Sequence, residues 1–207
     1  MIGSLLMSKP SLMARPVTIR TEQIVETARS LFLEHGFKLS TARIAKAVGI
    51  SEGSIFKRFA TKEALFAAAM GLPSTDFARG WPERAGQGSL EAELLAICHR
   101  LVVHFRVVLP RMIMLRRASP VDPLSVMSKV ESPPPVVLLD GVTEYLKREV
   151  ALGRFCVDEP RVAARMLVAG LMNFVFFEVM GFETHTEAET ARAVEGMVAL
   201  LIAGGTP

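Results

Sequence analysis

The stretch from residue 51 to residue 62 brings small hydrogen-bonding side chains close to several cations. Ser54 can hydrogen-bond to either type of base, Glu52 can accept from a cytosine amino group, and Lys57 can reach a guanine edge. Gly53 lies between them and, having no side chain, allows a second surface to approach closely. These residue types suit the reading of base edges in the major groove of duplex DNA.

A second group of side chains around this stretch suits contacts with phosphate groups. Arg58 and Lys62 add positive charge after the base-reading positions. Ahead of them, Ser40, Thr41 and Arg43 are candidates to hold the opposite phosphate strand. Contacts of this kind fix the position of a protein on the duplex without reading its sequence.

The spacing of Ala45, Gly49 and Ser51 predicts how these side chains are positioned. Ala45 allows two helices to approach closely, Gly49 can adopt the left-handed conformation that ends the first helix, and Ser51 can cap the second. This pattern is typical of a helix-turn-helix. If Ile55 and Phe59 face the core, several positions of the second helix must point outward. These positions are drawn from Glu52, Gly53, Ser54, Phe56 and Lys57.

The neighbouring helices are predicted from their ends. Apolar residues at helical spacing after Thr21 predict a first helix that Gly36 ends, and Thr61 is placed to cap a fourth. The helix before Gly49 begins at Ser40 or Thr41, and the sequence leaves that choice open.

Positive charge is concentrated at the N-terminal end. Residues 1–62 hold 10 Lys or Arg against 4 Asp or Glu, whereas residues 63–207 hold 14 against 17. The two balances, +6 and −3, add to the net charge of +3 of the whole chain. A basic module followed by a mildly acidic, apolar body predicts that a polyanion binds at the N-terminal end only.

The rest of the chain has the pattern of helices and connecting segments. We expect a connector at 71–88, a helix from about 89 that Pro110 ends, a short helical piece at 111–118 and a loop around 119–135. Helices are then expected at 135–152 and from about 158 to 181. Thr186 and Glu189 form a capping box before the last helix. No segment alternates polar and apolar residues long enough to require a sheet, so the predicted fold is all-α.

The last two helices are predicted to form a dimer interface. In the last helix, Ala191, Val194, Val198 and Leu201 form one apolar stripe, and Ala193, Met197 and Leu200 form another. One face can pack within the subunit and the other against a symmetry mate, which gives a homodimer. A dimer would place two reading helices in successive major grooves of a near-palindromic operator.

The 11 Met and 12 Phe residues give the body an adaptable apolar interior. Candidate contacts of a small-molecule effector are His104, Met112, Met166, Asn173 and Phe177. Of these, His104 and Asn173 could orient a ligand by a hydrogen bond. Ordinary core packing is the alternative for Met112, Met166 and Phe177. For His104 and Asn173 the alternative is a hydrogen bond with the neighbouring backbone.

The sequence favours neither an enzyme nor a membrane protein. No glycine-rich phosphate loop, G-x-S-x-G motif or His-rich spacing occurs, so no catalytic residue, metal or cofactor is expected. The longest charge-free runs have 12 residues, short of the roughly 20 that a membrane-spanning helix needs. Residues 1–17 have the pattern of a disordered tail rather than a signal peptide. Cys98 and Cys156 are expected to be buried free thiols of a cytoplasmic protein.

Residues 18–70 resemble the DNA-binding domain of the TetR (tetracycline repressor) family of transcriptional regulators. The matching parts are, in order, "TEQIVETARSLFLEHGF", "STARIAKAVGIS", "EGSIFKRF" and "FATKEALF". The resemblance implies an all-helical dimer in which three N-terminal helices bind DNA and the others serve ligand binding and dimerisation. Phe56 stands where members usually carry a tyrosine that touches a phosphate. Arg58 stands where His or Tyr is common, and its charge is able to restore such a contact.

Together these features predict an all-α chain of about nine helices. It comprises a tail at 1–17, a helix-turn-helix DNA-binding domain at 18–66, and a helical ligand-binding and dimerisation domain at 67–207. The expected function is a dimeric, sequence-specific DNA-binding regulator, a repressor released from its operator by a small, largely apolar ligand. A transcriptional activator of the same fold and a helical adaptor that does not bind DNA are the alternatives.

Overall fold

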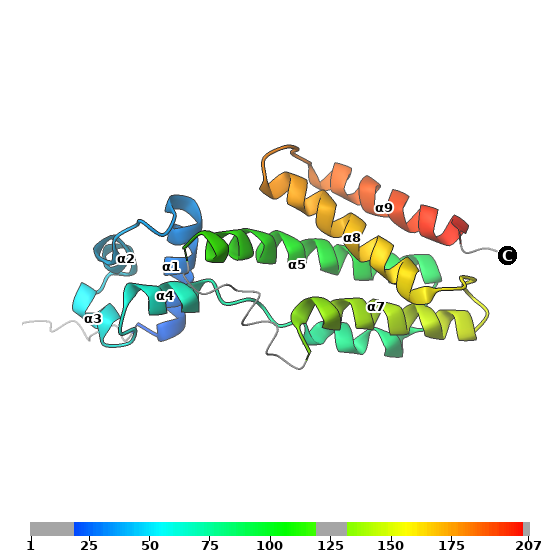
Figure 1. The fold of residues 1–207 in the computed structure, drawn as a ribbon, viewed down its shortest axis with the longest axis horizontal. Coiled ribbons are helices and arrows are strands. Elements are labelled where there is room, and N and C mark those ends of the chain that lie inside the picture. The colour runs from blue at the N-terminus through cyan, green and yellow to red at the C-terminus, as the bar shows by residue number, and fades with distance from the viewer. Residues whose placement is uncertain (1–18, 119–131, 205–207) are drawn as a thin grey trace, which may run out of the picture.

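The computed structural model describes residues 19–118 and 132–204 (Figure 1). These residues form eight α-helices and two short 3₁₀ helices and contain no strand, which confirms the predicted all-α fold. In chain order the elements are α1 (Thr21–His35), α2 (Thr41–Val48), α3 (Glu52–Phe56), α4 (Lys62–Ala69), η1 (Asp76–Gly80), η2 (Pro82–Arg84), α5 (Leu90–Ala118), α7 (Pro134–Ala151), α8 (Pro160–Val179) and α9 (Glu187–Gly204). The predicted tail at 1–17 and most of the predicted loop at 119–135 lie outside the described residues.

Helices α1–α4 form a small unit, here called the head, at one end of the molecule (Figure 1). α1 packs against both α2 and α4, and α2 packs against α3. The centre of the head is filled by the fully buried side chains of Ile24, Phe32, Ile44, Ile55 and Leu65. This core continues through Ala69 and Met70, while the domain boundary at residue 66 stays a prediction.

Helices α5, α7, α8 and α9, with η1 and η2, form the body. α5 packs against α8 and α9, and α7 packs against α8 and the two 3₁₀ helices. At the crossing of α7 and η1, a Cβ added at Gly141 would lie 2.5 Å from the carbonyl oxygen of Ala78. Only a glycine therefore allows this close approach.

Helix α5 does not stop at Pro110, so that prediction is wrong. The helix runs without interruption from Leu90 to Ala118, although a proline has no N–H to donate to the preceding turn. Contacts on both sides of Pro110 stabilise the helix. Leu101 before the proline is buried in the body, and Met114 and Leu115 after it pack against the head. Tertiary packing outweighs the local effect of the proline.

Two segments join the head to the body. One is the connector that follows α4, and the other is the C-terminal end of α5 (Figure 1). Nη1 of Arg111 on α5 donates to the carbonyl oxygen of Gly71 in the connector at 2.7 Å, which ties the two segments together. Nε of Arg29 on α1 donates to the carbonyl oxygen of Ala69 at 2.7 Å, just before the connector begins.

The predicted capping box at the start of α9 is confirmed. The N–H of Glu189 donates to Oγ1 of Thr186 at 3.2 Å, and the N–H of Thr186 donates to Oε2 of Glu189 at 2.8 Å. The prediction of two buried thiols holds for Cys98 and is wrong for Cys156, which is exposed. Cys156 lies in the segment between α7 and α8.

Within the described ranges, α8 alone is long and apolar enough to cross a membrane by length and composition. It has 20 residues. The most apolar stretch of 18 residues within it has a mean hydropathy of 1.7, and 28% of that stretch is buried. The helix packs against α5, α7 and α9. It also carries Arg161, Arg165 and Glu178, side-chain types that are costly inside a bilayer. Packing in the body accounts for one part of its apolar surface, and the remaining face is described below.

Candidate DNA-binding site and ligand-binding regions

The turn between α2 and α3 is built as its spacing predicts. Gly49 has φ 81° and ψ 31°, a left-handed conformation that disfavours residues with a side chain. The N–H groups of Gly49 and Ile50 both donate to the carbonyl oxygen of Ala45, at 2.9 and 3.0 Å. Ser51 then caps α3, because its hydroxyl oxygen accepts from the N–H of Ser54 at 3.2 Å.

Helix α3 presents most of its surface to solvent. Ile55 is fully buried and anchors it to the head. Of the predicted outward positions, Glu52, Gly53, Phe56 and Lys57 are exposed and Ser54 is half-buried. A Cβ added at Gly53 would meet nothing closer than the hydroxyl oxygen of Ser51 at 4.0 Å. Another surface can therefore approach the backbone of α3 at this point.

Thr41 does not lie on the outer surface of the head. Its side chain is only 7% exposed, and its hydroxyl donates to the carboxylate of Glu52, which joins α2 to α3. Ser40, not Thr41, caps α2, since its hydroxyl oxygen accepts from the N–H of Arg43 at 3.4 Å. Thr41 is thus mostly buried and joins α2 to α3, and its predicted phosphate contact stays a prediction.

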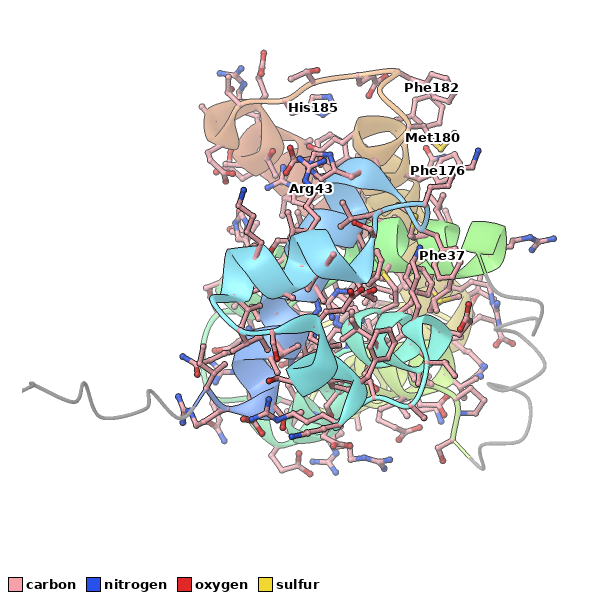
Figure 2. All side chains as sticks on the ribbon, turned by 90° about the vertical axis from the view of Figure 1, so that its left-hand side faces the viewer. Phe37, Arg43, Phe176, Met180, Phe182 and His185 are labelled. Carbon is pink, nitrogen blue, oxygen red and sulfur yellow. The ribbon has the colours of Figure 1, made fainter. Side chains whose placement is uncertain are left out.

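Arg43 and Lys62 are each held by a ring of the head. Nη2 of Arg43 lies 3.0 Å from Nε2 of His35. Nζ of Lys62 lies 4.6 Å from the centre of the Phe37 ring, within the range of a cation–π contact. Arg43 and Phe37 are both marked in Figure 2, which looks onto the head. Contacts of this kind restrict the motion of the two cations, so less side-chain entropy would be lost if a partner bound them.

Lys57 and Arg58 follow the last turn of α3, and both are exposed. Nη2 of Arg58 donates to the carbonyl oxygen of Ile19 at 2.8 Å, which ties α3 to the segment before α1. The ammonium group of Lys57 has no hydrogen bond or ion pair among the described residues, so it is free for an outside partner. Phe56 is 43% exposed and brings an apolar ring to the same surface.

The five candidate ligand contacts of the body do not converge on one cavity among the described residues. His104 on α5 lines a cavity of about 150 Å³. Met166 and Asn173 are exposed on α8, whereas Met112 on α5 and Phe177 near the end of α8 are half-buried. These side chains therefore belong to at least two separate surfaces.

Met166 lies in a larger groove of about 700 Å³ between the first half of α8 and the second half of α9. Met166 is 71% exposed, and Leu200 across the groove is 76% exposed. From the groove an apolar face, here called the α8 stripe, continues along the helix. The α8 stripe consists of the exposed side chains of Val162, Met166, Met172, Phe176 and Met180. Figure 2 marks Phe176 and Met180 at the end of the stripe, with the exposed Phe182 beside them.

Two polar arrangements were not predicted from the sequence. The bond from Thr41 to Glu52 joins two helices, and no sequence pattern identifies such a pair. Arg106 on α5 donates from Nε and Nη2 to the carboxylate of Glu178 on α8, at 2.9 and 2.8 Å. Hydrogen bonds from Arg106 lower the pKa of Glu178 despite its burial, and a hydrogen bond with His185 adds to the effect.

A basic helix-turn-helix head on a helical body defines a DNA-binding transcriptional regulator of two functional parts. Residues 24–69 match the model of the bacterial regulatory proteins of the tetR family, and residues 134–204 match the C-terminal domain of AefR-like transcriptional repressors. The chain belongs to the TetR family of transcriptional regulators. The HTH-type transcriptional repressor AcnR of Corynebacterium diphtheriae is 35% identical to it over 150 residues, 70% of this chain and 72% of that protein. The predicted function of a DNA-binding transcriptional repressor is confirmed.

Solved structures share the fold over most of the chain. A TetR-family regulator of Mesorhizobium loti has a TM-score of 0.64 and 19% identity, with 89% of this chain and 96% of that chain covered. FadR of Bacillus subtilis in complex with stearoyl-CoA has a TM-score of 0.59 and 16% identity, over 90% and 100% of the two chains. The complex of SmeT with triclosan has a TM-score of 0.57 and 20% identity, over 90% and 91%.

Proposed function

We propose that the outward face of α3 reads one half of a near-palindromic operator, and that a small, largely apolar ligand bound by the body releases this repressor from DNA in the cytoplasm. The observation that supports the reading role most directly is the open space in front of Gly53, beside the free ammonium group of Lys57. A short helix with such a face can enter a major groove.

The contacts divide into two kinds. Glu52, Ser54 and Lys57 lie where base edges would be read, and one carboxylate oxygen of Glu52 already accepts from Thr41. The phosphate contacts would come from three cations around α3 and from the residue that caps α2. These residues are Arg43, Arg58, Lys62 and Ser40. Because phosphate contacts position the protein without reading sequence, the two kinds can be separated by experiment.

The second apolar face of the body supports a homodimer. Val194 and Val198 of α9 are fully buried within one chain, whereas Leu200 and the α8 stripe remain uncovered. A two-fold axis beside α8 and α9 would cover both copies of this face in a four-helix interface. Asn173 lies within the exposed surface of α8, where a polar group can fix the register of a dimer rather than contact a ligand.

The proposed effector is largely apolar because two proteins of the same fold were solved with ligands that have large apolar parts. FadR was solved with stearoyl-CoA and SmeT with triclosan, and both ligands have large apolar parts. A ligand releases DNA only if it binds the non-binding conformation more tightly, with couplings of about 1–3 kcal/mol.

Selection of bound duplexes from a random pool, followed by sequencing, tests the reading role. The selected duplexes should contain two inverted half-sites about one helical turn apart. Binding measured by fluorescence anisotropy should weaken steeply with salt, because each phosphate contact releases counterions. No enrichment from the pool, together with salt-independent binding, would refute the proposal.

Lys57 and Lys62 provide a matched pair of variants. Lys57→Ala should cost about 1–3 kcal/mol on the selected operator and relax the preference at one base position. Lys62→Ala should weaken binding to all duplexes alike and reduce the salt slope by about 1. If both variants lost affinity equally on every sequence, the division into reading and phosphate contacts would be wrong.

A further inference from the structure

A small cavity lies between α5 and the connector that leaves the head. Its volume is about 150 Å³. It is lined by Pro73, Ser74 and Phe77 from the connector and η1, and by Arg100, Val103, His104 and Val107 from α5. At about 30 Å³ for each water in the liquid, this space corresponds to about five waters, or to an organic molecule of about six non-hydrogen atoms.

His104 is a buried polar side chain without a polar partner. It is 8% exposed, and its ring packs against the rings of Phe77 and Phe105, with centroids at 5.5 and 5.9 Å. The imidazole makes no hydrogen bond within the described part of the chain. Burial, and then the charge of Arg100, lower the pKa of His104. A neutral ring has one donor and one acceptor. Neither ring nitrogen is among the fully enclosed, unpartnered side-chain atoms of the described residues, so the nitrogens are accessible from the cavity that His104 lines.

Arg100 lies one helical turn before His104 and faces the same cavity. Its guanidinium carbon is 4.6 Å from the centre of the Phe77 ring. Among the described residues it has no ion pair, whereas Arg106 on the same helix binds Glu178. The cavity therefore has an exposed arginine without an anion at its rim and, beside it, a largely buried imidazole with no hydrogen bond among the described residues.

We propose that this cavity binds a short-chain organic acid. The carboxylate would bind Arg100 and accept a hydrogen bond from His104, while the alkyl chain would lie against Val103, Val107 and Phe77. A guanidinium suits a carboxylate because its planar donors match the two oxygens. The valines and the ring favour an alkyl chain over a second charged group, because an unpaired buried charge is costly.

The position of the cavity couples it to the head, and this step rests on the proposed release of the repressor from DNA. Phe77 lies soon after the connector from α4, and His104 lies on the helix whose Met114 and Leu115 pack against the head. Arg111 holds these two segments together through Gly71. A ligand wedged between the connector and α5 changes their separation, and with it the position of the head. The operator affinity should fall by about 5- to 150-fold, the usual range of such couplings.

Isothermal titration of the full chain with sodium butyrate, without DNA, tests the site. Butyrate should bind to the wild type, whereas butyramide, which has the same size and no charge, should bind at least ten-fold more weakly. Arg100→Gln and His104→Phe should each weaken butyrate binding at least ten-fold. Arg192→Gln on α9, which removes an exposed arginine far along the chain from the cavity, should leave it unchanged.

Thermal unfolding of each variant shows whether it is folded. If either Arg100→Gln or His104→Phe fails to fold, the other variant still tests the site. Absence of butyrate binding, or equal binding by both variants and the wild type, would overturn the site. Butyrate binding that leaves the operator affinity unchanged would overturn the coupling. A wild type that binds no duplex would instead refute the proposed operator contact, while the titration still decides the cavity.

Discussion

The dimer face proposed for α8 and α9 gives a prediction whose size follows from the structure. The double variant Met166→Ala with Leu200→Ala removes the two largest exposed apolar side chains of the 700 Å³ groove. Both residues lie on the outside of one chain, so their loss leaves the core of the subunit intact. The expected result is a folded monomer.

The magnitude comes from the exposed fractions. Complete burial of a Leu or Met side chain contributes about 1.5–3 kcal/mol. Met166 is 71% and Leu200 76% exposed, so each has roughly three quarters of that contribution still to gain, about 1–2 kcal/mol. A two-fold interface contains each residue twice, so the double variant should lose about 4–8 kcal/mol. The dissociation constant of the dimer should rise by roughly three to six powers of ten.

Sedimentation velocity over a range of protein concentrations measures this change. Val136→Ala is the control, because Val136 is also exposed, at 41%, and lies on α7 outside the groove. The control should keep the wild-type dissociation constant, and circular dichroism should show that all three proteins are helical. A monomeric wild type, or a control that dissociates as readily as the double variant, would refute the assignment of this face.

Three further changes test the head and the body separately. Gly53→Ala should stabilise α3 by about 0.5–1 kcal/mol. It should nevertheless weaken operator binding in anisotropy measurements, because the methyl group fills the open space in front of the α3 backbone. Unchanged DNA affinity would contradict the placement of α3 in the major groove. Thr41→Val should lower the free energy of unfolding in urea by about 1–2 kcal/mol, and the loss should shrink in a Glu52→Ala background if the hydroxyl acts through that carboxylate. The pKa of Glu178 is lowered mainly by Arg106, so its stabilising effect is present above the unfolded pKa and is lost as the pH falls through the folded value. Between about pH 6 and about pH 3, the melting temperature of the wild type should therefore fall more than that of Glu178→Gln, and parallel curves would show that the ion pair does not contribute.

The features that were predicted correctly depend on neighbours in the sequence. Gly49, Ser51 and the pair Thr186 and Glu189 act within one helical turn of their partners, so residue type and spacing suffice to identify them. The apolar stripes of α9 were also recognisable, since helical periodicity alone defines a face.

The features that were missed depend on which faces of distant helices meet. Thr41 has the residue type of a cap, but the packing of α2 on α3 buries it and brings its hydroxyl to Glu52. Asn173 interrupts an apolar run and lies on the exposed side of α8, which the run alone does not show; its role as a ligand contact stays a prediction. A periodic pattern shows that two faces exist, and it does not show which of them is covered within one chain.

Pro110 is the case in which local and tertiary effects oppose each other most directly. If α5 ended there, as the proline predicts, Met114 and Leu115 would belong to a separate element that could move independently of His104. The helix instead continues to Ala118, so the side chains that touch the head and those that line the small cavity belong to one continuous helix. The distance along the helix axis from His104 to Met114 is about 15 Å. A displacement of α5 at the cavity would therefore be transmitted to the head through one helix. Pro110, which has no N–H to donate, is the point between the two at which that helix bends most easily.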